Sequence, residues 1–426
     1  MTLEFGCRAN DNKSTELADP GPGVPLTLAM ERAQSIEGPS YDLAFTIPAS
    51  PSDPISGHAS IRFAAKDLTR PVVLDFSPGT DYIKSITVAG RPSNFRVVKD
   101  HIIIPREEIA SEDNKIEIMF RAGDASLNRT ADFMYTLFVP ARAHLAFPCF
   151  DQPNLKARFA LELDVPADWQ AVSNGAETFH EMAGDRLRVR YAETQPISTY
   201  LFAFAAGKFQ IETAERNGRW YRMFHRETDA KKVERNKKAV FDLHASSLEW
   251  LEKYTGIPYR FGKFDFVLIP SFQFSGMEHP GSIYYNSSSL LLEESATENQ
   301  MLNRATTIAH ETSHMWFGDL VTMQWFNDVW MKEVFANFMA SKIVNPAFPN
   351  VNHDLRFLVS NYPVAYSVDR TAGTHPIRQE LANLDEAGSL YGAIIYQKAP
   401  IVMRQLERIL GSEKFQDGLR AYLKQF

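Results

Sequence analysis

The sequence is poor in cysteine, in basic charge and in long apolar runs. Only two of its 426 residues are cysteines, Cys7 and Cys149, and they lie far apart, which implies no disulfide framework. No apolar run approaches the roughly 18 residues that a membrane-spanning helix needs. The net charge of −7 gives no basic surface, so we expect no nucleic-acid partner. A hydrophobic content of 44% is ample for the buried cores of two or three domains.

The first residues are polar and rich in Asp, Asn, Pro and Gly, and they contain no visible signal peptide. We therefore expect residues 1–24 to form a flexible lead-in. Two interpretations of Cys7 stay open. It is either an incidental residue of the lead-in or a lipid-attachment site left after a leader is removed. The sequence does not fix a location, and both the cytoplasm and the periplasmic side of a cell envelope are compatible with it.

Hydrophobic periodicity divides the remaining chain near residue 210. Before this point, short segments alternate polar and apolar residues, as in 41–48, 58–65 and 158–166, which predicts an N-terminal all-β domain over residues 25–210. After it, a strand pattern at 264–270 is combined with helical periods, which predicts an α+β domain over residues 211–426. The expected helices are 229–254, 298–317, 328–344, 350–361, 400–410 and 412–425.

The best candidate for a functional site begins in the expected helix 298–317. This segment contains neither Pro nor Gly, and Thr297 and Gln300 have the spacing of a capping box. Within it, His310 and His314 have the spacing H-E-x-x-H and lie one turn apart on the same helix face. Two imidazoles placed in this way can bind one metal ion at roughly 2.0–2.1 Å.

A third candidate ligand, Glu333, follows His314 after eighteen residues. It lies in the next helical segment, which we expect Asn327 to cap and Asn345 and Pro346 to close. The surrounding helix face is mostly apolar, where a carboxylate is costly unless it has a partner, and a metal ion would provide one. Two His and one Glu leave the fourth zinc position open, which is typical of catalytic sites. We therefore expect one zinc ion per chain; the alternative is that these are ordinary helix residues.

Four blocks of the sequence stand out: Phe147–Pro153 (FPCFDQP), Gly276–His279 (GMEH), His310–Thr322 (HETSHMWFGDLVT) and Tyr396–Lys398 (YQK). Together they resemble the gluzincin family of zinc aminopeptidases, which includes aminopeptidase N and the leukotriene-hydrolysing aminopeptidases. This resemblance implies a thermolysin-like catalytic domain that removes the N-terminal residue from peptides with a free N-terminus. Members usually have a further helical domain after the catalytic one, and we expect that domain to be absent from this chain because the chain is truncated.

The resemblance also implies roles for individual residues. Glu311 is adjacent to the first ligand, so its carboxylate can reach the attacking water rather than the metal, and we expect it to act as general base. Glu278 is expected to bind the terminal ammonium of the substrate, while the backbone of Gly276 and Met277 aligns the peptide as an added strand. Tyr396 is expected to donate its phenolic O–H to the oxyanion.

The position of Tyr396 has a physical basis in the sequence. Pro400 cannot lie inside a helix without clashing with the carbonyl group four residues earlier, which belongs to Tyr396. The last helices should therefore begin near Ala399 and Pro400, with Tyr396 at an irregular junction.

Several positions depart from the family pattern. A second amine-binding Glu or Gln is replaced by Val139, and the last Asn of G-x-M-E-N is His279. The residue before the third ligand, usually Asn, is Lys332, and the Gly after the Tyr-x-Lys segment is Ala399. Two alternatives therefore stay open beside the aminopeptidase: a zinc endopeptidase, which Val139 favours and Glu278 opposes, and a non-catalytic peptide-binding relative. Epoxide hydrolysis, known in one branch of the family, has no feature here that supports it.

Overall fold

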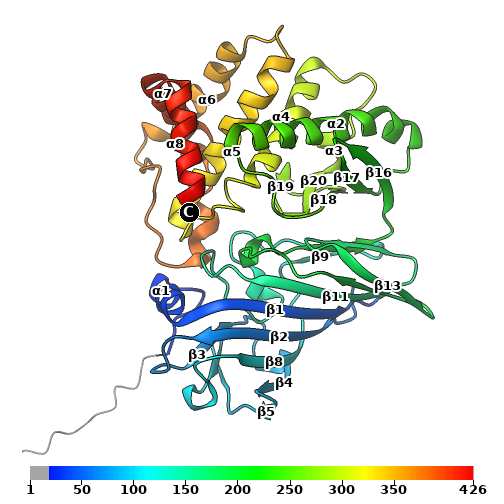
Figure 1. Cartoon of the computed structure of the whole chain (residues 1–426), viewed down its shortest axis with the longest axis vertical. Helices are drawn as coiled ribbons and strands as arrows, with labels where there is room; N and C mark the ends of the chain where they lie inside the picture. Colours follow the sequence, from blue (N-terminus) through cyan, green and yellow to red (C-terminus); the bar gives the residue numbers. More distant parts are fainter. Residues whose placement is uncertain (1–18, 426) are drawn as a thin grey trace, which may run out of the picture.

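The computed structural model describes residues 19–425 and shows two domains stacked on each other (Figure 1). A β-rich domain forms the lower half of this view, and a domain with most of the helices forms the upper half. The expected change of character at residue 211 falls inside β16, Gln210–Arg216, which belongs to the sheet of the second domain. Cys7, the candidate for lipid attachment, lies outside the described residues.

The N-terminal domain is built on an eight-stranded sheet with the order β13-β14-β11-β1-β2-β8-β4-β5. In this sheet β1 pairs antiparallel with β2 and parallel with β11. Two smaller sheets, β12-β15-β10-β9 and β3-β7-β6, complete the domain. The strands are β1 Ile36–Thr46, β2 Ser56–Ala65, β3 Val72–Asp75, β4 Ile83–Val88, β5 Arg91–Pro92, β6 Arg96–Val98, β7 His101–Ile104, β8 Asn114–Arg121, β9 Leu127–Arg129, β10 Phe133–Thr136, β11 Arg158–Pro166, β12 Gln170–Ser173, β13 Glu177–Ala183, β14 Arg186–Tyr191 and β15 Phe204–Gly207.

Two expectations for this domain need correction. The domain is not all-β, because Pro25 is followed by helix α1, Leu26–Ser35, whose buried residues are Leu28, Ala29 and Arg32. At the end of the segment that we assigned to a flexible lead-in, Gly23 and Val24 are buried. Val24 is only 1% exposed and its carbonyl oxygen accepts a hydrogen bond from the Leu384 N–H of the second domain, at 3.0 Å. Backbone pairing between distant segments has no signature in local composition, which explains the error.

A buried ionic cluster connects α1 to the neighbouring small sheet. The Arg32 guanidinium donates two hydrogen bonds to the Asp75 carboxylate, at 2.5 and 2.7 Å. The Nδ1 atom of His101 lies 2.9 Å from the same carboxylate. Burial opposes the ionisation of Asp75, but Arg32 and His101 hold its pKa well below the usual range. The cluster therefore keeps a charged carboxylate inside the domain.

The second domain contains a five-stranded sheet between two layers. The sheet has the order β16-β17-β18-β20-β19, with β17, β18 and β20 parallel to one another. On β18, Phe264, Phe266 and Leu268 belong to the core shared with the helices, whereas Val267 and Ile269 belong to the core of the N-terminal domain. Successive side chains of a strand point to opposite faces, so β18 packs into both cores and joins the two domains into one unit. The remaining strands are β17 Arg219–His225, β18 Phe264–Ile269, β19 Gly276–Met277 and β20 Ser282–Asn286.

Side-chain caps and a glycine mark the ends of two helices of the second domain. The carboxylate of Asp229 accepts hydrogen bonds from two backbone N–H groups at the start of α2, and Gly256 ends this helix with a φ of 70°. The expected capping box of Thr297 and Gln300 is present at the start of α4. Asn327 does not cap α5, because residues 326–328 form a turn of 3-10 helix. The bounds are α2 Ala230–Thr255, α3 Ser287–Leu290, α4 Glu298–His314, α5 Val329–Val344, α6 His353–Asp369, α7 Ala399–Leu410 and α8 Ser412–Gln425.

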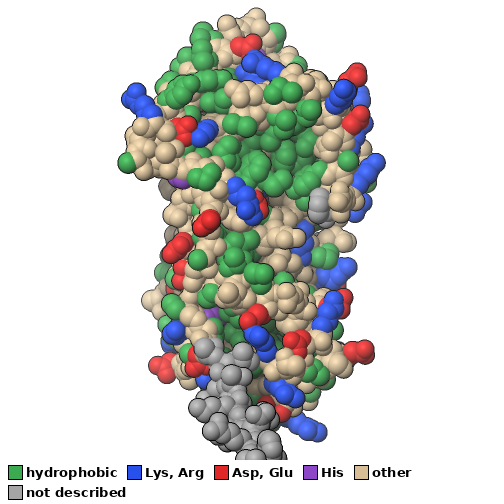
Figure 2. Space-filling view, turned by 90° about the vertical axis from the view of Figure 1, so that its left-hand side faces the viewer, with side chains coloured by type: hydrophobic (Ala, Val, Ile, Leu, Met, Phe, Trp, Pro, Cys, Tyr) green, Lys and Arg blue, Asp and Glu red, His purple; other side chains and the backbone are tan. Residues whose placement is uncertain are grey.

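Apolar side chains are exposed on α6 and α7. Figure 2 shows hydrophobic side chains gathered on the upper, helical part of one face of the molecule. Leu358 and Val359 of α6 and Val402 and Ile409 of α7 are all exposed, Ile409 by 81%. Within residues 19–425, no helix combines the length and hydrophobicity needed to cross a lipid bilayer.

Candidate active site

Helices α4 and α5 bring the three expected metal ligands together. His310 and His314 lie one turn apart near the end of α4, with their Nε2 atoms 3.0 Å apart. Glu333 reaches them from α5, and its Oε2 atom lies 3.5 Å from His310 Nε2 and 3.9 Å from His314 Nε2. The three side chains form a group whose ligand atoms lie close enough together to hold one metal ion.

The hydrogen bonds on the far side of each imidazole orient its free nitrogen. His314 Nδ1 lies 3.0 Å from the carbonyl oxygen of Phe317, and His310 Nδ1 lies 3.1 Å from Asn337 Oδ1. Both oxygens only accept, so each Nδ1 donates, and the Nε2 atom of the neutral ring carries a lone pair. Two lone pairs and the Glu333 carboxylate therefore face one point. Such an arrangement is stable around a cation, and the donor set fits zinc.

The pKa values of the three proposed ligands are compatible with a bound cation. Burial lowers the pKa of His314 to about 4, which keeps its ring neutral at pH 7. Burial also opposes the charged forms of the other two groups. Nevertheless, Lys332 and the two imidazoles hold the pKa of Glu333 well below its usual range, and the nearby Glu333 carboxylate raises the pKa of His310. The proposed ligand set therefore combines a charged Glu333 carboxylate with a neutral His314 ring.

Glu311 lies on α4 beside the ligands and is buried. Burial is the main reason that its pKa rises to about 8. Its carboxylate fits closely against β19, because an added Cβ atom on Gly276 would lie 2.3 Å from Glu311 Oε1. Any side chain at position 276 would therefore displace this carboxylate.

The expected substrate-binding segment forms an edge of the sheet. Gly276 and Met277 make up β19, which pairs antiparallel with Tyr284 and Tyr285 of β20 and is the last strand of the sheet. Glu278 follows directly and is 4% exposed. Its carboxylate forms an ion pair with a residue of α5, because the Lys332 ammonium donates a hydrogen bond to Glu278 Oε1. The sequence marked Lys332 only as a departure from the family pattern and gave no sign of this contact.

Tyr396 lies at a junction, as the sequence predicts. Residues 394–398 form a π-helical turn, and α7 begins at Ala399 with Pro400 in its first turn. The Tyr396 ring is stacked on Tyr391 with the ring centres 6.3 Å apart. Burial raises the pKa of Tyr396 far above its usual value, so its phenol keeps the proton and remains a donor.

One cavity of about 530 Å³ contains all these groups. Its lining includes the eight expected site residues Gly276, Met277, Glu278, His310, Glu311, His314, Glu333 and Tyr396. Lys332, Asn337 and Tyr391 are among the further lining residues that received no role in the sequence analysis. Asn337 carried a usable signal, because it follows Glu333 by one helical turn and therefore shares its face.

The N-terminal domain also contributes to the cavity. Val139 and Pro140 line it, so the position of the expected second amine anchor is apolar here.

His279 is fully buried against the ring of Tyr284, and among the described residues neither of its ring nitrogens has a hydrogen-bond partner. Burial lowers its pKa to about 3, so this ring stays neutral and brings no charge to Glu278.

Comparison with known proteins identifies the family. Residues 38–201 match the peptidase M1 N-terminal domain, and residues 240–426 match the peptidase family M1 domain. The chain belongs to the peptidase M1 family. This result confirms the resemblance to the zinc aminopeptidases that the sequence blocks indicate, and the β-rich domain followed by a domain with helices fits the M1 architecture.

Relatives of this M1 chain occur in plants and archaea. Aminopeptidase M1-C of Oryza sativa subsp. japonica is 36% identical over 299 residues, which are 70% of this chain and 34% of the rice protein. Tricorn protease-interacting factor F2 of Thermoplasma acidophilum is 31% identical over 350 residues, 80% of this chain and 43% of the relative. Probable aminopeptidase 2 of Sulfurisphaera tokodaii is 32% identical over 364 residues, which are 83% of this chain and 46% of the relative. The chain therefore spans less than half the length of these relatives.

Proposed function

We propose that this chain is a zinc-dependent peptidase of the aminopeptidase type, with one zinc ion held by His310, His314 and Glu333. The observation that carries the proposal is the convergence of two imidazole lone pairs and one carboxylate on a single point. When bound, zinc supplies a Lewis acid that polarises the scissile carbonyl group and activates water. We further propose that the second domain is thermolysin-like, which the placement of the three ligands on two neighbouring helices supports.

Glu311 is proposed as the general base. It shares the cavity with the ligands, fits against Gly276 on β19 and lies outside the group of His310, His314 and Glu333. Its carboxylate also lies close to Glu278 and His314, with which it forms a second group that could hold an ion. In its ionised form, this carboxylate can take a proton from the attacking water and then pass it to the leaving amine. The carbonyl carbon thereby gains a hydroxyl group, and the amine leaves with the proton.

Tyr396 is proposed to stabilise the oxyanion. Its phenol is held at the junction between the π-helical turn and α7 and lines the cavity beside Glu333. Because its proton is retained, the O–H group can donate to the negative charge that develops on the carbonyl oxygen.

The edge strand β19 is proposed to align the substrate. Gly276 and Met277 lie at the end of the sheet, where a peptide can add as a further strand. Glu278 follows at the end of this strand and is proposed to contact the terminal amine of the first residue. A peptide with a free N-terminus is therefore the proposed substrate. Endopeptidase activity is a second candidate, favoured by the apolar Val139 and by the Lys332 ammonium already paired with Glu278.

The test is hydrolysis of amino acid anilides by the protein that contains this chain, loaded with one equivalent of zinc. We expect hydrolysis that a chelator abolishes and that added zinc restores. His314→Ala should lose both zinc binding and hydrolysis, whereas Glu311→Gln should lose hydrolysis and keep zinc. Failure of the wild-type protein to bind zinc, or metal-independent hydrolysis, would refute the proposal.

A further inference from the structure

Lys332 is a buried cation at the centre of the cavity. Its side chain is 3% exposed, and its ammonium donates to Glu278 Oε1 while lying 3.2 Å from Glu333 Oε1. The two oxygens of Glu333 thus face different partners, with Oε2 toward the imidazoles and Oε1 toward Lys332. One lysine therefore connects the carboxylate of the proposed metal site with the carboxylate of the proposed amine site.

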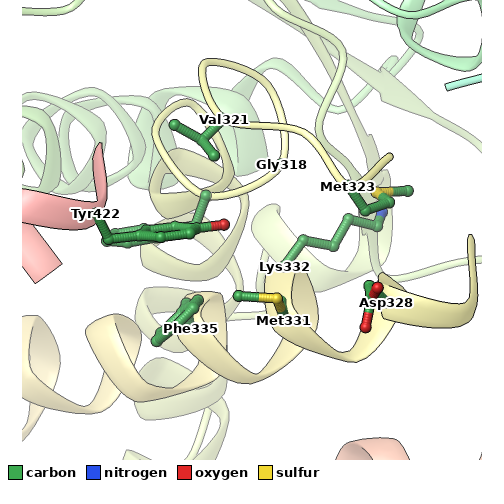
Figure 3. Close-up of a pocket in the computed structure, with 9 residues that line it drawn as sticks. Gly318, Val321, Met323, Asp328, Met331, Lys332, Phe335 and Tyr422 are labelled. Carbon is green, nitrogen blue, oxygen red and sulfur yellow. The ribbon is translucent and has the colours of Figure 1, made fainter. Parts of the chain in front are cut away.

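The stem of Lys332 is held in place along its length. Figure 3 shows the side chain leaving α5 among residues that line a small cavity, including Gly318 and Met323. An added Cβ atom on Gly318, whose φ is 134°, would lie 3.3 Å from Lys332 Cβ and 3.4 Å from its Cδ. The ring of Tyr200 lies 5.3 Å from the ammonium, a favourable position for a cation. A substrate therefore cannot displace Lys332 into solvent without disturbing this packing.

The charges around Glu278 leave little attraction for a second cation. Three carboxylates line the cavity, and the proposed function assigns Glu311 to the water and Glu333 to the metal. Glu278 is the remaining one, and it already has a fixed ammonium as partner. A substrate ammonium on the same carboxylate would lie close to Lys332, and like charges repel strongly in a buried site.

We infer that Lys332 is a specificity-determining residue that neutralises Glu278, so that the site accepts peptides with an uncharged, acylated amino group as well as free ones. This inference rests on the proposed peptidase function and deepens it. An acylated amine keeps one N–H donor that can share the Glu278 carboxylate without adding charge. Val139 and Pro140 offer the acyl group an apolar surface. The reaction is plain hydrolysis: water adds a hydroxyl group to the scissile carbonyl carbon, the C–N bond breaks, and the leaving amine takes the proton.

The experiment compares alanine 4-nitroanilide with N-acetylalanine 4-nitroanilide on the zinc-loaded protein. For the wild type, we expect kcat/KM for the two substrates to agree within about tenfold. Lys332→Met keeps the length of the side chain and removes its charge, which frees Glu278. This variant should raise the preference for the free amine by at least about tenfold, mainly through a lower KM.

Two further variants separate specificity from folding. Glu278→Gln with Lys332→Met restores neutrality at the pair, and its preference should return to the wild-type ratio even if the single variant is unstable. Ser341→Ala, an exposed change on α5, should leave the ratio unchanged. A wild-type preference for the free amine above about 100-fold, or an unchanged ratio in Lys332→Met, would overturn the inference. If the zinc-loaded wild type cleaves neither substrate, the proposed function itself fails, and this inference fails with it.

Discussion

Replacement of Asn337 by Ala tests how the imidazole of His310 is held. The Asn337 amide oxygen accepts a hydrogen bond from His310 Nδ1 at 3.1 Å, which leaves Nε2 free to bind a metal. The matching partner of His314 is the backbone carbonyl of Phe317, which no substitution removes. Asn337 is therefore the side chain through which the orientation of a proposed ligand can be changed without touching the ligand itself.

The expected magnitude follows from the loss of this one contact. The hydrogen bond contributes about 1 kcal/mol, and the ring gains rotational freedom worth roughly 0.5–1 kcal/mol. Together these terms weaken zinc binding by about 10–30-fold. This lies in the lower part of the roughly 10–100-fold range for such supporting residues, because Asn337 is half-buried and water can partly replace it.

The assay is competition for zinc against a chromogenic chelator. We expect Asn337→Ala to raise the Kd for zinc, and Asn337→Asp to keep it within a few-fold of the wild type because an acceptor remains. Ser341→Ala, one turn further along α5, is the control and should bind zinc like the wild type. An unchanged Kd in Asn337→Ala, or an equal loss in Asn337→Asp, would show that the hydrogen bond does not orient His310.

Four other predictions follow from the same structure. Glu311→Gln should lower kcat by about 10²–10⁴-fold at unchanged zinc content measured by atomic absorption, and a loss of zinc would contradict its role as a base. Tyr396→Phe should lower kcat by about 10²–10³-fold with little change in KM, so equal steady-state rates would exclude the oxyanion role. Gly276→Ala should reduce hydrolysis by at least about tenfold and keep zinc binding, because its methyl group displaces the Glu311 carboxylate; full activity would disprove this close fit. Arg32→Met should destabilise the fold by about 3–5 kcal/mol at pH 7 in urea unfolding. Because the pKa of Asp75 is depressed in the folded state, that loss should shrink below about pH 4, and a loss independent of pH would argue against the ion pair.

The convergence of the three proposed metal ligands could be predicted from the sequence because it depends on local spacing. His310 and His314 share a helix face by their separation alone, and the capping box at Thr297 fixes where that helix begins. Tyr396 was placed at a junction by the steric demand of Pro400, and the π-helical turn is found there.

Contacts between distant segments could not be predicted in this way. The pair of Lys332 and Glu278 joins residues 54 positions apart, and no local pattern reports that α5 faces the end of β19. The hydrogen bonds from Asn383 and Leu384 to the carbonyl groups of Pro22 and Val24 have the same origin. Asn327 was a reasonable cap by residue type, but the 3-10 turn before α5 moves the helix start and leaves its side chain without that role.

Val139 and Pro140 border the cavity although they belong to the first domain, whereas the proposed metal ligands lie on helices of the second. The hydrophobic core continues across this boundary through Val267 and Ile269 of β18, so the position of these two residues is set by the packing of both domains. Substitutions in the first domain can consequently change the proposed substrate preference while the proposed catalytic groups remain untouched. Conversely, a cavity formed by the second domain alone would lack the side that Val139 and Pro140 provide.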